Sequence, residues 1–287
     1  MAKSVNELTR RDILKLSAMA MAGAYTGIAR SAFAGEEVAK AGRKIPIALQ
    51  LYTVRADCAK DFEGTVKAVA KMGYEGVEFA GYYNRKAEDI RKLLDDCGLK
   101  CAGTHTGLAT LEGDKLKETI EFNKTIGNKF LVVPGGIPGK RSWAECGKYF
   151  SELAGKVKAE GMRVGYHNHA HEFATEGGST HWETFFNNAG PDVVMQLDMG
   201  NCMKGNGDPV SFLKKFPGRA VTVHMKEHYS SEKPGVLGEG DVKWKEVIEL
   251  CKTTAGTEWF IVEQESYPVS PLDTAQKCLE GLKKLTA

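Results

Sequence analysis

Residues 129–134 read Lys-Phe-Leu-Val-Val-Pro, and residues 144–160 read Ala-Glu-Cys-Gly-Lys-Tyr-Phe-Ser-Glu-Leu-Ala-Gly-Lys-Val-Lys-Ala-Glu before Gly161. The first segment is a short apolar run, which is typical of a strand buried on both faces of a parallel sheet. The second has the period of an amphipathic helix, and Gly161 can adopt the left-handed conformation that ends one. The stretch 129–161 therefore predicts one strand, a polar loop and one helix.

The same unit recurs eight times along the chain. Strands are expected at residues 45–53, 74–80, 100–105, 129–134, 163–169, 193–198, 220–226 and 259–265. Helices are expected at residues 62–72, 87–97, 115–126, 144–160, 181–188, 210–216, 244–253 and 272–285. Eight such units predict an α/β fold, a closed (β/α)8 TIM barrel. The competing doubly wound sheet would need a Gly-rich phosphate turn after its first strand, and residues 51–55 contain no glycine.

The segment before the first strand resembles a twin-arginine export signal. Arg10 and Arg11 precede an apolar stretch of small residues at 16–28, and Ala32-Phe33-Ala34 forms an A-x-A-like cleavage site. The alternative is a short amphipathic helix that begins with two arginines. The apolar stretch is shorter than the roughly 20 residues needed to span a bilayer. We expect a signal peptide at 1–34, a short leader at 35–44, a single barrel domain at 45–287 and a periplasmic location.

Composition and charge exclude several classes of protein. The chain has 287 residues, of which 42% are hydrophobic and 26% charged, so it is neither disordered nor fibrous. The formal net charge is +2, and removal of residues 1–34 takes away five basic and two acidic residues, which leaves −1. Nucleic acid and anionic membranes are therefore not expected as partners, and a small-molecule ligand is.

The seven cysteines carry no paired CxxC spacing, so no structural zinc site is indicated. Cys97 and Cys101 could pair in an oxidising compartment. However, Cys97 ends a predicted helix and Cys101 begins a predicted strand, which favours free thiols.

Four consecutive strands end in polar residues that share one side of the strand. Alternate residues of a barrel strand point inward, and active sites lie at the carboxyl ends of the strands. The pairs in phase are His167 with His169, Gln196 with Asp198, His224 with Lys226, and Glu263 with Glu265. Buried carboxylates are costly unless they meet a cation. We therefore predict one divalent ion, Mn²⁺, Zn²⁺, Co²⁺ or Fe²⁺, because imidazole ligands disfavour Ca²⁺.

Several motifs together resemble the sugar phosphate isomerase/epimerase family of xylose-isomerase-like TIM barrels. These are ALQLYTVR at 48–55, YHNH at 166–169 with EF at 172–173, QLDMGN at 196–201, VHMK at 223–226, GEG at 238–240 with W at 244, and VEQ at 262–264. The resemblance runs from about residue 45 to the C-terminus. It implies a sugar-modifying enzyme with one divalent metal. Carried over by position, the metal ligands are His167, Asp198, His224 and Glu263.

The fifth-strand position departs from the related ketose epimerases, in which a glutamate both binds metal and moves the substrate proton. Here that position holds His167, although His169 is also a candidate ligand. An imidazole that coordinates metal is a poor base because its lone pair is occupied. Another side chain must then move the proton, and His169 and Lys226 are the expected catalytic residues, with Glu265 also in reach.

Other strand ends offer substrate contacts. We expect these from Gln50, Glu78, His105 and Glu265. Gln50, Glu78 or His105 alone could equally be a buried structural residue, and His105 is favoured because His-Thr-Gly ends a strand at the catalytic face. Lys233 and its neighbours lie in a loop long enough to act as a lid.

The sequence thus predicts a metal-dependent isomerase, epimerase or lyase. Its substrate is expected to be an unphosphorylated sugar or keto-sugar derivative, because no phosphate-cradling turn is evident and phosphorylated sugars are scarce outside the cytoplasm. The alternative is a non-catalytic periplasmic sugar-binding or accessory protein on the same barrel. The presence of His167 in place of the glutamate supports this alternative.

Overall fold

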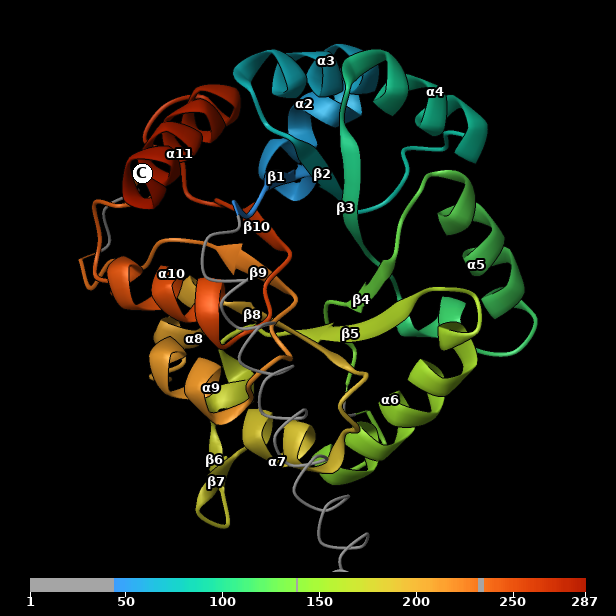
Figure 1. The fold of residues 1–287 in the computed structure, drawn as a ribbon, viewed down its shortest axis with the longest axis vertical. Coiled ribbons are helices and arrows are strands. Elements are labelled where there is room, and N and C mark those ends of the chain that lie inside the picture. Colours follow the sequence, from blue (N-terminus) through green and yellow to red (C-terminus); the bar gives the residue numbers. More distant parts are fainter. Residues whose placement is uncertain (1–43, 138, 232–234) are drawn as a thin grey trace, which may run out of the picture. The chain divides into compact units, whose positions relative to one another are not determined.

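Eight parallel strands close into a barrel in the order β1-β10-β9-β8-β5-β4-β3-β2, which confirms the predicted (β/α)8 architecture (Figure 1). The computed structural model describes residues 44–287 except residue 138 and residues 232–234. The barrel strands are β1 (Ile47–Gln50), β2 (Gly76–Phe79), β3 (Lys100–His105), β4 (Phe130–Val133), β5 (Arg163–His167), β8 (Val194–Asp198), β9 (Thr222–Met225) and β10 (Trp259–Val262). The predicted signal peptide, the leader up to residue 43 and the lid residue Lys233 lie outside the described residues.

Helices surround the strands (Figure 1). They are α2 (Arg55–Lys60), α3 (Phe62–Met72), α4 (Ala87–Cys97), α5 (Lys115–Thr125), α6 (Trp143–Lys158), α7 (His181–Asn188), α8 (Met199–Lys204), α9 (Pro209–Lys215), α10 (Trp244–Thr253) and α11 (Pro271–Thr286). Short elements complete the chain, namely the 3₁₀ turns η2 (Leu51–Val54), η3 (Leu108–Leu111) and η4 (His171–Phe173) and the hairpin strands β6 (Thr175–Glu176) and β7 (Ser179–Thr180). Among the described residues, none of the helices has the length and apolar character needed to cross a membrane.

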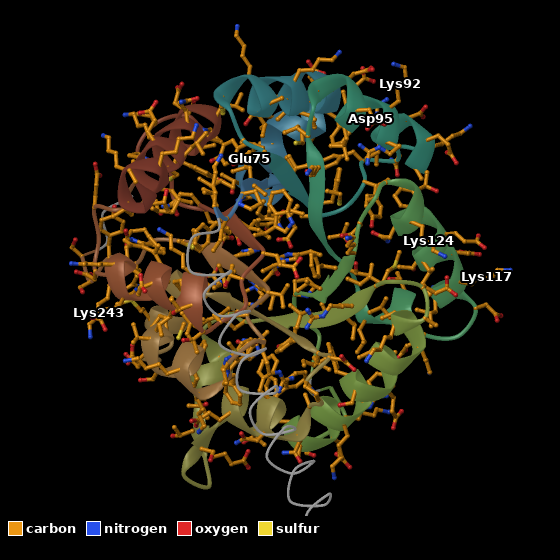
Figure 2. The ribbon with its side chains drawn as sticks, in the orientation of Figure 1. Glu75, Lys92, Asp95, Lys117, Lys124 and Lys243 are labelled. Carbon is orange, nitrogen blue, oxygen red and sulfur yellow. The ribbon has the colours of Figure 1, made fainter. Side chains whose placement is uncertain are left out.

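Charged side chains lie on the outer surface of the helices, where both signs are mixed. Figure 2 shows Lys92 and Asp95 on α4 and Lys124 on α5 at the edge of the molecule. Lys92 pairs with Asp96 at 2.6 Å, and Lys124 pairs with Glu160 at 2.5 Å. This alternation fits the near-zero net charge and gives no broad cationic face in this region.

Three predicted strands end two or three residues earlier than the sequence pattern indicates. The first ends at Gln50, because the Gln50 side chain accepts a hydrogen bond from the Tyr52 backbone N–H at 3.0 Å and starts a 3₁₀ turn. The fifth ends at His167 and the last at Val262. Polar residues expected at strand ends therefore lie on the loops just beyond them, where the chain can aim each side chain independently.

The amino end of the barrel is filled by apolar side chains. A separate buried cluster contains Ala48, Ala102, Phe130, Val132, Val194, Val221, Trp259 and Ile261. On β8 and β10, Val194 and Ile261 precede the polar residues of the same inward-facing phase. Gly76 leaves space for this packing, since a Cβ there would lie 3.0 Å from the Trp259 ring. Most polar inward residues thus lie toward the carboxyl end, and Thr222 at the start of β9 is a polar exception that accepts a hydrogen bond from Gln196.

All seven cysteines are free thiols, so Cys97 and Cys101 do not pair. Six are buried and Cys97 is half-buried. This agrees with the free thiols that the sequence favours.

Candidate active site

The four side chains expected to bind metal converge at the carboxyl end of the barrel. His167, Asp198, His224 and Glu263 are all buried, and one donor atom from each lies within 4.8 Å of the others. Asp198 and His224 are paired on neighbouring strands. Nδ1 of His224 lies 2.5 Å from Oε2 of Glu263 and 3.8 Å from Oδ2 of Asp198. Ligands held at about 2.0–2.3 Å from one ion lie about 3.0–4.6 Å apart, so this set approaches single-ion geometry, and the short His224–Glu263 contact must lengthen when an ion binds.

Asp198 supports this fit independently. Its Oδ2 is buried and has no hydrogen-bond partner within the described chain, while Oδ1 accepts a hydrogen bond from the Asn201 backbone N–H at 2.7 Å. Asn168 holds the Asp198 backbone from both sides, at 2.8 and 3.1 Å. Nδ1 of His224 and Nζ of Lys226 lie 3.8 and 3.9 Å from Oδ2, too far for a hydrogen bond, and a buried carboxylate oxygen without a hydrogen bond is costly. A cation beside Oδ2 would satisfy it.

His224 lies between two carboxylates. Its Nε2 is 2.6 Å from Oε2 of Glu78, and its Nδ1 faces Glu263. Burial lowers the pKa of His224, but the charges of Glu78 and Glu263 outweigh burial and raise that pKa well above its ordinary value. Burial raises the pKa of Glu263, whereas Lys226 and His224 lower it, and the net pKa lies below its usual range. Nδ1 of His224 faces the predicted metal ligands Asp198 and Glu263, while Nε2 faces Glu78.

His167 has the opposite character. Burial and the neighbouring imidazoles hold its pKa well below the ordinary value, so it is neutral at pH 7. Its Nδ1 lies 3.1 Å from Oε1 of Gln196. Because Nε2 of Gln196 donates to Glu78 and Thr222, at 2.7 and 3.0 Å, Oε1 is the acceptor and the His167 proton is assigned to Nδ1. The lone pair on Nε2 is then available to a metal.

Two of the expected substrate contacts lie beneath this cluster. Gln50 and Glu78 have no exposed surface, and Nε2 of Gln50 donates to Oε2 of Glu78 at 2.7 Å. Burial raises the pKa of Glu78, but His105 and His224 lower it more, so Glu78 is ionised. Neither residue lines a described cavity. The structure places them as supports of the imidazoles.

The other two expected contacts, His105 and Glu265, line a central cavity of about 370 Å³ above the cluster. Tyr52, His167, His169 and Glu263 also border it. This cavity brings two of the four predicted metal ligands, His167 and Glu263, and the predicted proton-transfer residue His169 into one space.

His169 meets the geometric requirements of a base that is separate from the metal ligands. It is exposed to the central cavity, and its ring centroid lies 5.2 Å from that of His167. Its ring makes no hydrogen bond within residues that the structure describes. Its backbone N–H donates to Oε2 of Glu172 at 2.8 Å, and the Tyr166 hydroxyl donates to the same carboxylate at 2.6 Å. Glu172 therefore holds the loop that carries His169.

Lys226 forms an ion pair with Glu265, and its Nζ lies 3.9 Å from Oδ2 of Asp198. Burial lowers the pKa of Lys226, but the charges of Asp198, Glu263 and Glu265 raise it by more, so the net pKa lies above its ordinary value. Lys226 is thus held as a cation, which favours stabilisation of negative charge over proton abstraction.

Sequence reasoning missed Glu227, which organises the loop between β9 and α10. Its buried carboxylate accepts hydrogen bonds from the backbone N–H groups of His228, Gly238 and Val242 and from the Trp244 indole, at 2.7–3.2 Å. The GEG motif at 238–240 and Trp244 belong to the family resemblance, but the side chain that accepts their hydrogen bonds depends on the loop conformation. A carboxylate directly after a strand, with glycines and Trp244 downstream, was the available signal.

Comparisons with known proteins agree with this architecture. Residues 66–285 match the family model described as xylose isomerase-like TIM barrel. Rhizopine catabolism protein MocC of Rhizobium meliloti is 21% identical over 267 residues, which cover 78% of this chain and 82% of that protein. Inosose dehydratase of Clostridium beijerinckii is 25% identical over 271 residues, covering 78% and 90%. A crystal structure of a sugar phosphate isomerase/epimerase from Parabacteroides distasonis has a TM-score of 0.72 and 24% identity, covering 84% of this chain and 98% of that one.

Proposed function

Because the chain belongs to the xylose isomerase-like TIM barrel family, we propose that it is a divalent-metal-dependent isomerase, epimerase or lyase acting on an unphosphorylated sugar or keto-sugar derivative. The observation that carries this proposal is Oδ2 of Asp198, which is buried without a hydrogen bond inside a cluster of four donor atoms and has only the longer contacts to His224 and Lys226 at 3.8 and 3.9 Å. A merely structural cluster would be expected to satisfy that oxygen internally.

His167, Asp198, His224 and Glu263 would hold the ion. When bound, a divalent ion polarises a carbonyl or hydroxyl oxygen of the substrate and so makes the adjacent C–H group more acidic. The two carboxylates among these residues offset the charge of the ion, and the neutral His167 supplies a lone pair without adding charge.

His169 is the proposed general base. Its imidazole removes the proton from the carbon next to the carbonyl, and the electron pair of the broken C–H bond moves to the carbonyl oxygen, giving an enolate. In an isomerisation the imidazolium gives the proton to the neighbouring carbon, while the hydroxyl proton on the first carbon moves to the former carbonyl oxygen. In an epimerisation a second acid must protonate the enolate on the face opposite His169, because return of the proton by His169 restores the original configuration. In an elimination the electron pair instead expels the substituent on the β-carbon, to which the imidazolium gives its proton. The Lys226 cation beside the cavity would stabilise the negative charge that develops.

The relatives support a sugar-type substrate, since one is named inosose dehydratase and another sugar phosphate isomerase/epimerase. Phosphorylated sugars are scarce outside the cytoplasm, so export would favour an unphosphorylated substrate. The Arg10-Arg11 motif with its apolar stretch and Ala32-Phe33-Ala34 supports export to the periplasm. We therefore place an unphosphorylated substrate and a periplasmic location in the same proposal.

The alternative, a non-catalytic sugar-binding protein, rests on His167 in the position that holds a glutamate in ketose epimerases. The exposed ring of His169 favours the enzyme, because it provides a base that is not needed for metal binding.

Deuterium uptake separates the two functions. The protein, loaded with Mn²⁺ or Zn²⁺, would be incubated in heavy water with free keto-sugars and 3-keto-glycosides, and the recovered sugars and products analysed by mass spectrometry. Incorporation of deuterium, or a dehydrated product, is expected with at least one substrate. Sugar binding without exchange or product across the panel would favour the binding protein.

A further inference from the structure

A second and larger cavity adjoins the central one. It has a volume of about 680 Å³, compared with about 370 Å³ for the central cavity. Glu265 lines both, and Lys226, its ion-pair partner, lines the larger. Ligand pockets usually measure about 300–1,000 Å³, so the central cavity alone has room for a small substrate. The larger cavity is additional space beside the reacting centre.

The wall of this larger cavity is built by fixed contacts. His228 and Tyr229 line it, and both belong to the loop that Glu227 gathers through its four hydrogen bonds. The Tyr229 hydroxyl donates to the Val236 carbonyl at 2.8 Å. Gly240 permits this folding, because a Cβ there would lie 2.3 Å from the His228 carbonyl oxygen. A wall with this many internal contacts is organised before a ligand arrives.

The opposite side is also held in place. The Tyr267 hydroxyl donates to the Thr53 carbonyl at 2.9 Å and accepts from Nη1 of Arg55 at 2.9 Å. Lys204, at the end of α8, lines the cavity, and its ammonium has no ion pair or hydrogen bond within the described residues. Ser266 adds a hydroxyl. Fixed aromatic rings beside hydroxyl and ammonium donors suit a hydroxyl-rich ring, whose C–H faces pack on aromatic groups.

The charge of the lining argues for a neutral occupant. Lys226 is matched by Glu265, and the Glu227 carboxylate is fully used by its own loop. Lys204 alone leaves too little positive charge to cradle a phosphate, which proteins bind with several backbone or cationic donors.

We propose that the substrate is a two-unit glycoside whose reacting keto-sugar occupies the central cavity while a second sugar ring occupies the larger cavity. This inference rests on the proposed function and narrows its substrate class. Binding a second ring through contacts far from the reacting carbon would also orient the first ring above His167 and His169.

The test uses keto-disaccharides that carry a fructose unit. Calorimetry would compare D-fructose with lactulose, isomaltulose and turanose on the Mn²⁺-loaded protein. We expect at least one disaccharide to bind about 10 to 100-fold more tightly than fructose. Ser266→Trp, which fills the larger cavity, should reduce this preference at least tenfold, and Lys204→Ala should reduce it severalfold. Thr175→Trp is the matched control, because Thr175 is exposed on the β6–β7 hairpin and lines no described cavity.

Melting curves check that the Trp variants fold, and Lys204→Ala, at an exposed position, tests the cavity without bulk. Equal binding of fructose and all three disaccharides would overturn the proposal, as would an unchanged preference in both cavity variants. A third cavity, lined by Tyr82 and Phe122, adjoins the central one at His105. A disaccharide preference that is lost in Thr110→Trp but kept in Ser266→Trp would place the second ring there and also refute the proposal.

The two proposals can fail separately. A disaccharide preference that depends on Ser266, without deuterium exchange, would refute the proposed chemistry and leave the second-ring site. Deuterium exchange into fructose with no preference for disaccharides would support the proposed chemistry and refute the second-ring site.

Discussion

Nε2 of His224 lies 2.6 Å from Oε2 of Glu78, and both side chains are fully buried. The contact fixes the imidazole ring so that Nδ1 faces Asp198 and Glu263. Glu78 therefore acts on the candidate metal site through His224 and does not need to touch metal or substrate. Carboxylates that orient metal-binding histidines typically contribute about 10 to 100-fold to metal affinity.

Glu78→Gln should accordingly weaken binding of Mn²⁺ or Zn²⁺ by about 10 to 100-fold, while turnover at saturating metal falls less. Metal titration followed by calorimetry measures the affinity, and a melting curve reports on folding. Glu145→Gln is the control, since Glu145 is exposed and caps α6 far from the site. Unchanged metal affinity in a folded Glu78→Gln protein would contradict the assigned role.

His169→Gln tests the base. We expect bound metal to be retained and turnover to fall by about 10² to 10⁴-fold, the usual contribution of a positioned general base. Metal content and rate must be measured on the same sample. If metal is lost but the rate at saturating metal is normal, His169 is a ligand or a support for one, and His167 would have to be reconsidered as the fifth-strand ligand.

Gly165 supplies a stability prediction that is independent of function. A Cβ at this strand position would lie 2.8 Å from both the Cβ and the carbonyl oxygen of Val194. Gly165→Ala should therefore lower the free energy of unfolding by about 1–3 kcal/mol, as overpacking does. Gly155→Ala is the counterpart, because Gly155 is exposed within α6 and nothing lies within 4 Å of its Cβ position. It should raise the free energy of unfolding by about 0.5–1 kcal/mol. Equal effects of the two changes in chemical denaturation would show that strand crowding does not limit this position.

Export depends on residues outside the barrel. Arg10→Lys combined with Arg11→Lys should leave full-length protein in the cytoplasm, whereas the parent chain should be recovered from the periplasm beginning near Gly35. Cell fractionation and N-terminal sequencing of both proteins give the answer. Normal periplasmic recovery of the double variant would refute the twin-arginine assignment.

Simple periods predict the barrel and the four pairs of inward polar residues, and the resemblance to the family selects one ligand from each pair. Strand alternation places His167, Asp198 and His224 inside the barrel, and parallel pairing brings their strand ends together. Strand alternation does not predict whether an inward polar residue lines the cavity or lies buried below it. Glu78 has the same pattern as a pocket residue, yet contacts with Gln50, Gln196 and His224 place it below the cavity.

Strand ends and loop contacts were harder to predict for a related reason. The turn after β1 depends on one hydrogen bond from Tyr52 to the Gln50 side chain, which competes with continuation of the strand. The role of Glu227 depends on donors 11 to 17 residues away that only the folded loop brings together. Such contacts follow from three-dimensional placement and leave no regular spacing in the sequence.

Metal stoichiometry tests the central claim most directly. The purified protein would be stripped with chelator, reloaded with Mn²⁺ or Zn²⁺, desalted and analysed by inductively coupled plasma mass spectrometry beside Asp198→Ala and the exposed control Asp96→Ala. We predict about one ion per chain for the parent protein and for Asp96→Ala, and a loss of at least tenfold for a folded Asp198→Ala. A parent protein that retains no ion, or an Asp198→Ala protein that retains as much as the parent, would contradict the account.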